Sequence, residues 1–223
     1  MRCAALSFAC VLASIVAACG SEDRGITEPT PPSEVFVHNT LHRAGDRSSI
    51  DLVPSDFSTK YIPMISTLQP WTWDDFTSPV DTTIRTVSWQ GGYCRSALSP
   101  APSGAPGPKS FLVSFGSDYN GRPYFPDGLN TFTLTPAEAH EEFAFARTSS
   151  DYDCAYHDYT VVLPTAFPVT ASKRYWLLIR AGTDDGWWGW RIGLPDNGVS
   201  AHGWLNGGIV TDGKDLAFSL SSR

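Results

Sequence analysis

A short polar segment in the second half of the chain holds side chains that could bind a cation or transfer a proton. The nine residues that start at Asp151 read Asp-Tyr-Asp-Cys-Ala-Tyr-His-Asp-Tyr. On a strand, Asp151 and Asp153 would share one face and present two carboxylates to a cation. His157, beside a tyrosine and Asp158, could form an acid–base pair. The structural alternative is a solvated loop next to Cys154.

Three glutamates lie close together slightly earlier in the chain, at Glu138, Glu141 and Glu142. A glycosidase needs two carboxylates about 5–10 Å apart. Glu141 and Glu142 are adjacent, however, and would point to opposite faces of a strand, while glutamates at the start of a helix are ordinary stabilising charge. The G-x-S-x-G, H-E-x-x-H, G-x-G-x-x-G and P-loop signatures are absent from the sequence. A polysaccharide-degrading enzyme, either a hydrolase or a lyase, is therefore the alternative and not the main prediction.

Aromatic residues suggest a binding site for sugars. Trp188 and Trp190 alternate on one apolar strand face and are predicted to be buried, as are Trp89 and Trp176. Trp187 would lie on the opposite face, where an exposed indole could cover the C–H face of a pyranose while polar neighbours bind its hydroxyl groups. Packing of the indoles against the end of the domain is the alternative. The predicted carbohydrate-binding residues are Trp187, Trp204, Asp184, Asp185, Arg191 and Asn206.

Period-2 patterns predict the strands that would position these residues. Residues 111–115, 188–194 and 216–220 alternate apolar and polar or small side chains, and 19 glycines and 17 prolines fit a chain with many turns. One short helix is expected at 135–138, where a threonine, a proline and a glutamate resemble a capping box. We predict an all-β, two-sheet antiparallel sandwich with jelly-roll-like connections. Further strands are expected at 83–90, 130–134, 142–147, 156–163 and 174–180.

Charge excludes one class of partner. The 223 residues contain 16 Lys and Arg against 23 Asp and Glu, which gives a net charge of −7. These residues are spread along the chain without a basic cluster, whereas nucleic acids and anionic headgroups are bound by basic patches. We therefore expect no nucleic acid partner.

The first residues resemble the signal peptide of a bacterial lipoprotein. Val-Ala-Ala-Cys-Gly at 16–20 follows a positive start and a short apolar run, and it is similar to a lipobox. The resemblance implies that Cys19 is acylated, typically with palmitate, and that the exported protein is attached to the membrane. An ordinary secretory signal that ends near a cysteine is the alternative. The predicted organisation is a signal peptide at 1–18, a lipidated flexible tether at 19–33 and a single β-sandwich domain at 34–223. In the lipoproteins that this segment resembles, an aspartate after the acylated cysteine retains the protein in the inner membrane. The resemblance therefore implies the outer membrane in a host with two membranes, since residue 20 is a glycine.

Two cysteines remain in the predicted domain, Cys94 and Cys154. Cysteines in an exported chain generally pair, so a disulfide is expected between them. Two buried free thiols are the alternative. Neither cysteine belongs to a CxxC or Cys/His spacing that is typical of a metal site.

Several motifs resemble β-sandwich modules of exported, surface-anchored bacterial proteins of unassigned function. They are Trp-Asp-Asp-Phe-Thr at 73–77, Ile-Arg-Thr-Val-Ser-Trp-Gln-Gly-Gly-Tyr at 84–93, Arg-Tyr-Trp-Leu at 174–177 and Asp-Leu-Ala-Phe-Ser-Leu at 215–220. The wider architecture is similar to calcium-containing carbohydrate-binding jelly rolls. This second resemblance implies a structural calcium ion held by Asp75 and Asp215, and their use as turn residues is the alternative. The resulting hypothesis is a membrane-anchored binding or structural module with weak affinity for a surface or extracellular polysaccharide.

Overall fold

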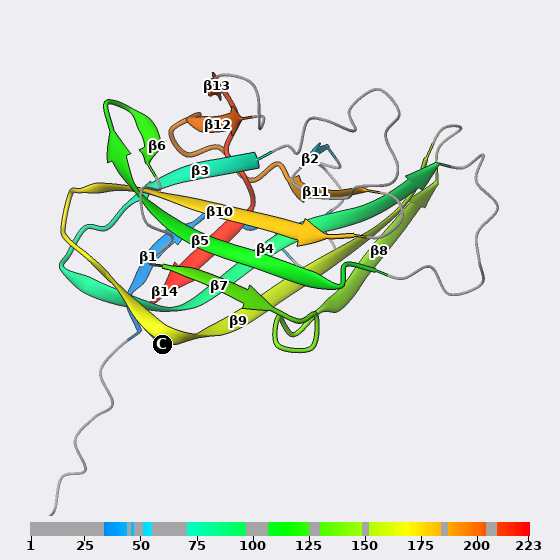
Figure 1. Cartoon of the computed structure of the whole chain (residues 1–223), viewed down its shortest axis with the longest axis horizontal. Coiled ribbons are helices and arrows are strands. Elements are labelled where there is room, and N and C mark those ends of the chain that lie inside the picture. The colour runs from blue at the N-terminus through cyan, green and yellow to red at the C-terminus, as the bar shows by residue number, and fades with distance from the viewer. Residues whose placement is uncertain are drawn as a thin grey trace, which may run out of the picture. The chain divides into compact units, whose positions relative to one another are not determined.

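Alternating apolar residues build two antiparallel β-sheets in the computed structural model of the chain (Figure 1). The structure describes residues 34–43, 46, 51–54, 71–96, 107–124, 130–148, 152–183, 187–203 and 209–223, and it contains no helix among them. The prediction of an all-β, two-sheet antiparallel sandwich is confirmed. The strands are β1 (Phe36–Asn39), β2 (Leu52–Pro54), β3 (Trp71–Thr77), β4 (Thr82–Ser96), β5 (Ser110–Tyr119), β6 (Arg122–Tyr124), β7 (Thr131–Leu134), β8 (Glu142–Thr148), β9 (Tyr152–Val169), β10 (Arg174–Gly182), β11 (Trp187–Arg191), β12 (Ser200–Gly203), β13 (Val210–Asp212) and β14 (Phe218–Ser221).

The long strands β4 and β9 form the centre of the first sheet. Along one edge β4 pairs with β14 and with β11. The outer neighbour of β14 is β1, and that of β11 is β2. The other edge of β4 pairs with β9, and β9 pairs with β8. The second sheet has the order β13-β12-β3-β10-β5-β6, and β7 also pairs with β5. Every strand pair in both sheets is antiparallel.

A ribbon of paired strands folds from one sheet into the other. In the second sheet β3 pairs with β10, where Thr77 lies opposite Arg174. The chain then crosses to the first sheet, where β4 pairs with β9 and Thr82 lies opposite Val169. The same two-stranded ribbon therefore contributes to both layers, which is the connection expected of a jelly-roll-like sandwich.

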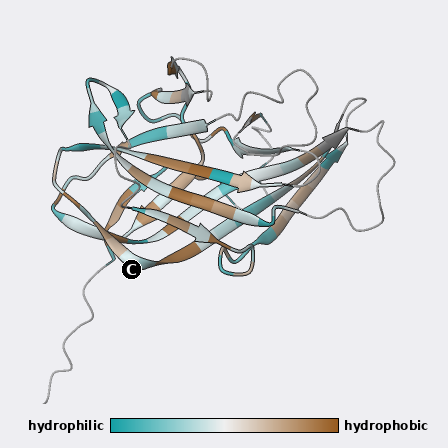
Figure 2. Ribbon diagram, viewed as in Figure 1, coloured by the Kyte–Doolittle hydropathy of each residue, from teal (hydrophilic) through white to brown (hydrophobic). Residues whose placement is uncertain are grey.

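The core lies between the sheets and is rich in aromatic rings. Trp89, Trp188 and Phe111 are fully buried. The Phe111 ring packs edge to face against both Trp89 and Trp188. Tyr159 stacks on Trp89, with their ring centroids 5.1 Å apart. Figure 2 shows hydrophobic residues along β5, β10 and β14, whereas the hairpin of β5 and β6 is largely hydrophilic. The predicted burial of Trp89, Trp176, Trp188 and Trp190 is confirmed.

The expected helix at 135–138 is replaced by a hydrogen-bonded turn. The capping contacts are present, since the Thr135 N–H donates to Oε2 of Glu138 at 2.7 Å and the Glu138 N–H donates to Oγ1 of Thr135 at 3.3 Å. The turn stops at His140, which adopts a positive φ of 40°, a left-handed conformation that a helix cannot continue through. The segment instead leads directly into β8.

Residues 34–223 form one compact unit, and no helix among the described residues is long and apolar enough to cross a membrane. Cys19, with the rest of the predicted signal peptide and tether, lies outside the described residues.

Candidate functional site

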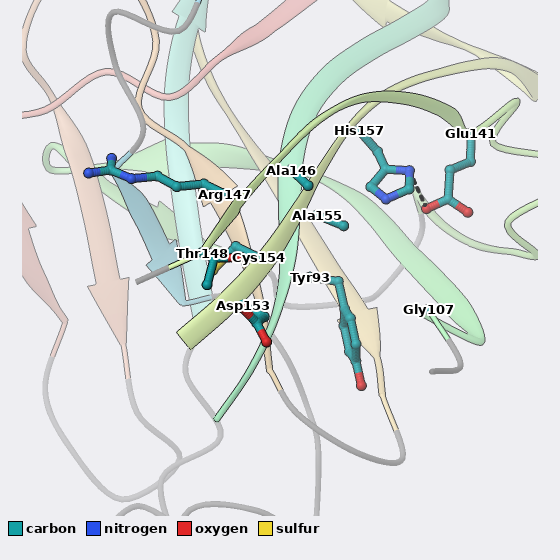
Figure 3. Close-up of a pocket in the computed structure, with 10 residues that line it drawn as sticks. All are labelled: Tyr93, Gly107, Glu141, Ala146, Arg147, Thr148, Asp153, Cys154, Ala155 and His157. Atoms are coloured by element: carbon teal, nitrogen blue, oxygen red, sulfur yellow. Dashed lines mark ion pairs between the residues drawn. The ribbon is translucent and has the colours of Figure 1, made fainter. Parts of the chain in front are cut away.

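A pocket of about 350 Å³ opens where β4, β8 and β9 approach their shared end (Figure 3). Its size falls within the range of small-molecule sites. It combines aromatic, small apolar and ionisable side chains. The lining residues are Tyr93, Gly107, Glu141, Ala146, Arg147, Thr148, Asp153, Cys154, Ala155 and His157.

Strand alternation places the ionisable groups of β9 in this pocket. Asp153, His157 and Tyr159 are separated by even numbers of residues, so they share the face that turns towards the opposite sheet. Tyr159 is buried in the core, but the strands extend beyond it, and His157 retains 18% of its side-chain exposure. The pocket is therefore the open continuation of the hydrophobic core.

Glu141 connects His157 to the core. Its Oε1 lies 3.1 Å from Nδ1 of His157 and accepts a hydrogen bond of 3.1 Å from the Tyr159 hydroxyl. Trp188 extends this chain, because its indole N–H donates to the Tyr159 oxygen at 3.4 Å. Figure 3 shows the imidazole and the Glu141 carboxylate directed towards each other.

Burial sets the protonation of the cluster. It lowers the pKa of His157, although the nearby carboxylates of Glu141 and Asp158 act in the opposite direction. Burial also raises the pKa of Tyr159 well above its usual value, and Glu141 adds to that shift. At neutral pH the imidazole and the phenol are therefore both neutral. The site presents a neutral histidine held beside a carboxylate.

The polar segment around residue 155 is a strand and not a solvated loop, so the structural alternative for it was wrong. His157 and Tyr159 share no hydrogen bond with each other, but both lie next to Oε1 of Glu141, which sequence reasoning had assigned to ordinary charge at a helix start. Asp153 lines the same pocket. Asp158 does not, because it faces the other side of the sheet and accepts a hydrogen bond of 2.8 Å from the Gln90 amide. Asp151 lies outside the described residues.

The disulfide adjoins the pocket. Cys94 and Cys154 lie directly opposite each other on β4 and β9, with an S–S distance of 2.02 Å. The predicted bridge is confirmed. It joins the two central strands of the first sheet close to the end where the pocket opens.

A second feature, which sequence reasoning missed, is an exposed pair of tyrosines on the β5–β6 hairpin. Tyr119 is 65% exposed and Tyr124 is 48% exposed, and their ring centroids lie 5.7 Å apart at a tilt of 37°. A hollow adjoins the hairpin, and its lining residues are Tyr119, Asn120, Arg122, Pro123, Tyr124 and Ile209. We refer to Tyr119, Tyr124, Asn120 and Arg122 as the tyrosine platform.

The hairpin turn and one aspartate hold the tyrosine platform in place. Asn120 and Gly121 have positive φ angles of 54° and 75°, as a tight two-residue hairpin turn requires. Oδ2 of Asp118 accepts the Gly121 N–H at 3.1 Å, and its Oδ1 accepts the indole N–H of the buried Trp176 at 2.9 Å. The hairpin is thereby linked to the body of the second sheet.

The six residues predicted to bind carbohydrate are only partly described. Trp187 is half-buried on the outer side of β11, and its ring covers Gly189, where an added Cβ would approach it to 2.9 Å. The indole therefore packs partly against its own strand and is not fully exposed. The others, Trp204, Asp184, Asp185 and Asn206, lie outside the described residues.

Arg191 is not part of an exposed sugar-binding surface. It is only 3% exposed, and its guanidinium donates to the Asp46 carbonyl at 2.7 Å and to Oε1 of Gln90 at 3.3 Å. The same group lies 5.6 Å from the centre of the Phe145 ring. Strand alternation had placed Arg191 outside the core correctly, but the chain around residue 46 covers it.

Asp75 and Asp215 are brought close enough to interact electrostatically. Each is already bound by the protein itself. Oδ1 of Asp75 accepts the Asn197 amide at 3.0 Å, and its Oδ2 lies 3.0 Å from Nε of Arg174. Asp215 accepts backbone N–H groups, including that of Gly198 at 2.9 Å. These contacts give both residues structural roles. Asp75 is buried within β3 and is not the turn residue of the alternative interpretation, whereas Asp215 lies in the connection that precedes β14.

A calcium ion would need six to eight oxygen ligands. Asp74, the third carboxylate nearby, accepts the backbone N–H groups of Leu216 at 2.6 Å and Asp75 at 2.9 Å. Its burial raises its pKa well above the usual value. Among the described residues, no group of three or more His, Cys, Asp or Glu side chains is arranged to hold a metal ion. The described part of the chain therefore does not supply the ligand set that was expected around Asp75 and Asp215.

Comparisons with known proteins found no matching family, no similar curated protein and no similar solved structure.

Proposed function

We propose that this chain is an exported, lipid-anchored module that binds a polysaccharide through the tyrosine platform. The observation that carries the proposal is the pair of exposed rings of Tyr119 and Tyr124, 5.7 Å apart on a hairpin whose conformation is held by Asp118. A monomeric protein rarely exposes large apolar groups side by side without a binding role. The lipobox-like segment around Cys19 supports the location.

The chemistry of the tyrosine platform suits a sugar. Aromatic faces can cover the C–H surface of a pyranose ring, while the phenol hydroxyls and neighbouring polar groups exchange hydrogen bonds with its hydroxyls. Arg122 lies opposite Tyr119 in the hairpin, and Asn120 occupies the turn, so both provide polar groups beside the rings. Because the surface is open, we expect an affinity between about micromolar and millimolar, or about −8 to −4 kcal/mol.

A glycan array probed with the full-length chain in detergent tests the proposal. Tyr119→Ala should abolish retention on the glycan that the wild type binds, with a melting temperature close to that of the wild type because the ring is exposed. Phe36→Ala is the matched control, since Phe36 is 59% exposed on a different strand. A blank array, or equal loss in both variants, would overturn the proposal. Capture of a protein ligand by the same tyrosines would replace the polysaccharide with a protein partner.

Membrane attachment has its own test. Cys19→Ser removes the thiol that would accept the acyl chain, and each buried methylene contributes about 0.8 kcal/mol to membrane residence. The variant should move completely from the detergent phase to the aqueous phase in a phase-separation assay. Retention of Cys19→Ser in the detergent phase would contradict lipid anchoring.

A further inference from the structure

We propose that the pocket formed by β4, β8 and β9 binds a protonated primary amine of the kind carried by an amino sugar. This site is separate from the tyrosine platform. Gly107 lines the pocket just before β5 begins, and Tyr119 lies at the last residue of that strand. The two sites are therefore near opposite ends of β5, and Figure 1 shows the β5–β6 hairpin on the left and the ends of β4 and β8 on the right.

The ionisable groups of the pocket complement a positive charge. Glu141 uses only Oε1 in its contacts with His157 and Tyr159, and its side chain keeps 23% exposure, so Oε2 can accept a further hydrogen bond. Asp153 supplies a second carboxylate on the same side of β9. An ammonium group has three N–H donors and no acceptor, which matches a pocket that offers acceptors.

His157 adds a third acceptor. Its Nδ1 faces Glu141, and in Figure 3 the other ring nitrogen points away from that carboxylate towards the interior of the pocket. In the tautomer that places the proton on Nδ1, beside the Glu141 carboxylate, Nε2 is the acceptor of the neutral ring. Burial lowers the pKa of His157 and so favours this neutral form at physiological pH.

Among the described side chains that line the pocket, positive charge does not compete with a cationic ligand. Arg147 is the single cation among them, and Figure 3 shows it extending away from Tyr93 and His157. Arg147 lies opposite Cys154 and on the outer side of the sheet. An anionic ligand would therefore meet the carboxylates of these described lining residues with no cation of the same set directed at it.

The remaining walls fit a small organic cation better than a bare metal ion. Tyr93 contributes an aromatic ring, and Ala146 and Ala155 provide small apolar surfaces. A protonated amine is attracted to an aromatic face, and its carbon skeleton can pack against the alanines. A volume of about 350 Å³ accommodates one sugar-sized molecule.

Isothermal titration of the full-length chain in detergent with glucosamine, and separately with N-acetylglucosamine, tests the inference. The two probes differ in the charge of one nitrogen and its acetyl group. We expect glucosamine to bind about tenfold more tightly, because only its amine can pair with the Glu141 carboxylate. Equal affinities, or no heat from glucosamine, would overturn the inference.

Two variants locate the binding. Asp153→Asn should weaken glucosamine about fivefold, since it replaces the charged acceptor for sugar hydroxyls at the far end of the pocket, four residues along β9 from His157, without changing the shape of the side chain. Glu142→Gln is the matched control, because Glu142 is exposed on β8 and does not line the pocket. If both variants weaken binding equally, the amine is held by general charge and the site is wrong. Tyr119→Ala should leave glucosamine affinity unchanged, so failure of the tyrosine platform is distinguished from failure of this pocket.

Discussion

The two ends of β5 display opposite ways of presenting polar and aromatic groups. At the hairpin end, Tyr119 and Tyr124 stand in solvent, held by a two-residue turn and by Asp118. At the pocket end, the ionisable side chains of Glu141 and His157 are held by Tyr159, which is nearly fully buried. The hairpin end therefore exposes aromatic rings that a polar side chain holds in place. The pocket end places ionisable side chains at the edge of the hydrophobic core, where a buried ring holds them.

This difference determines what each end can recognise. Exposed charges are weakened by water and salt, so the hairpin would bind through shape and ring contact. Partly buried charges interact more strongly, so the pocket would select its ligand by charge. The comparison predicts that mutations and pH should affect the two ends independently.

Removing the disulfide should produce the largest effect and should be confined in function to the pocket end. Cys94→Ala with Cys154→Ala opens a loop whose ends are 60 residues apart, which should cost about 4 kcal/mol of unfolding free energy in the chain-entropy model. Denaturant unfolding measures this loss. Hydrogen exchange should increase at the adjoining ends of β4 and β9 and stay unchanged in the β5–β6 hairpin. A uniform increase over both ends would show that they are not independent.

Much of the fold could be predicted because burial imposes a periodicity on the sequence. Phe111 and Val113 alternate with less buried neighbours on β5, and both are fully buried as that pattern requires. The pairing of Cys94 with Cys154 followed from there being two cysteines in the predicted domain. Trp188 and Trp187 were assigned to opposite faces of the sheet because adjacent residues of a strand point in opposite directions. These inferences need only the spacing of residues along one strand or, for the disulfide, the fact that the predicted domain contains two cysteines.

The sites depend on contacts that local spacing does not contain. Glu141 reaches Tyr159 across 18 residues, after a turn that replaces the expected helix and before an irregularity in the β8–β9 register. Arg191 is covered by the chain near Asp46, which is far away in sequence. The tyrosine platform was within reach of local reasoning, because the Asn-Gly pair at 120–121 is typical of a tight hairpin turn. Counting outwards from that turn would have placed Tyr119 and Tyr124 on the same face of the hairpin.

A smaller effect is expected at the hairpin end from Asp118→Ala. The substitution leaves the N–H groups of Gly121 and the buried Trp176 without their acceptor, which should cost about 1–3 kcal/mol. Glycan retention should fall because the two rings lose their fixed separation, whereas glucosamine affinity should not change. Asp81→Ala is the control, since Asp81 accepts the Ala171 N–H at 2.7 Å in the turn of the folded ribbon. The control should lower stability without altering glycan retention, and equal loss in the two variants would contradict a specific role for Asp118.

The smallest expected effect is a pH dependence that belongs to the pocket alone. Burial lowers the pKa of His157 below its usual value of 6.5, against the opposing charges of Glu141 and Asp158. The folded protein therefore binds this proton less readily than the unfolded chain, so the contribution of His157 to stability is present above pH 6.5 and decreases as pH falls through the folded pKa.

Protonation of His157 also removes an acceptor from the pocket and adds a positive charge beside Glu141. Glucosamine affinity of the wild type, relative to that of His157→Gln at the same pH, should then decline as pH is lowered from about 7.5 to about 5. Titrations of the wild type and of His157→Gln at each pH measure this, and the variant should show a flatter profile. The same decline in both proteins would assign the pH dependence to another group, and a parallel decline in glycan retention would remove the distinction between the two ends of β5.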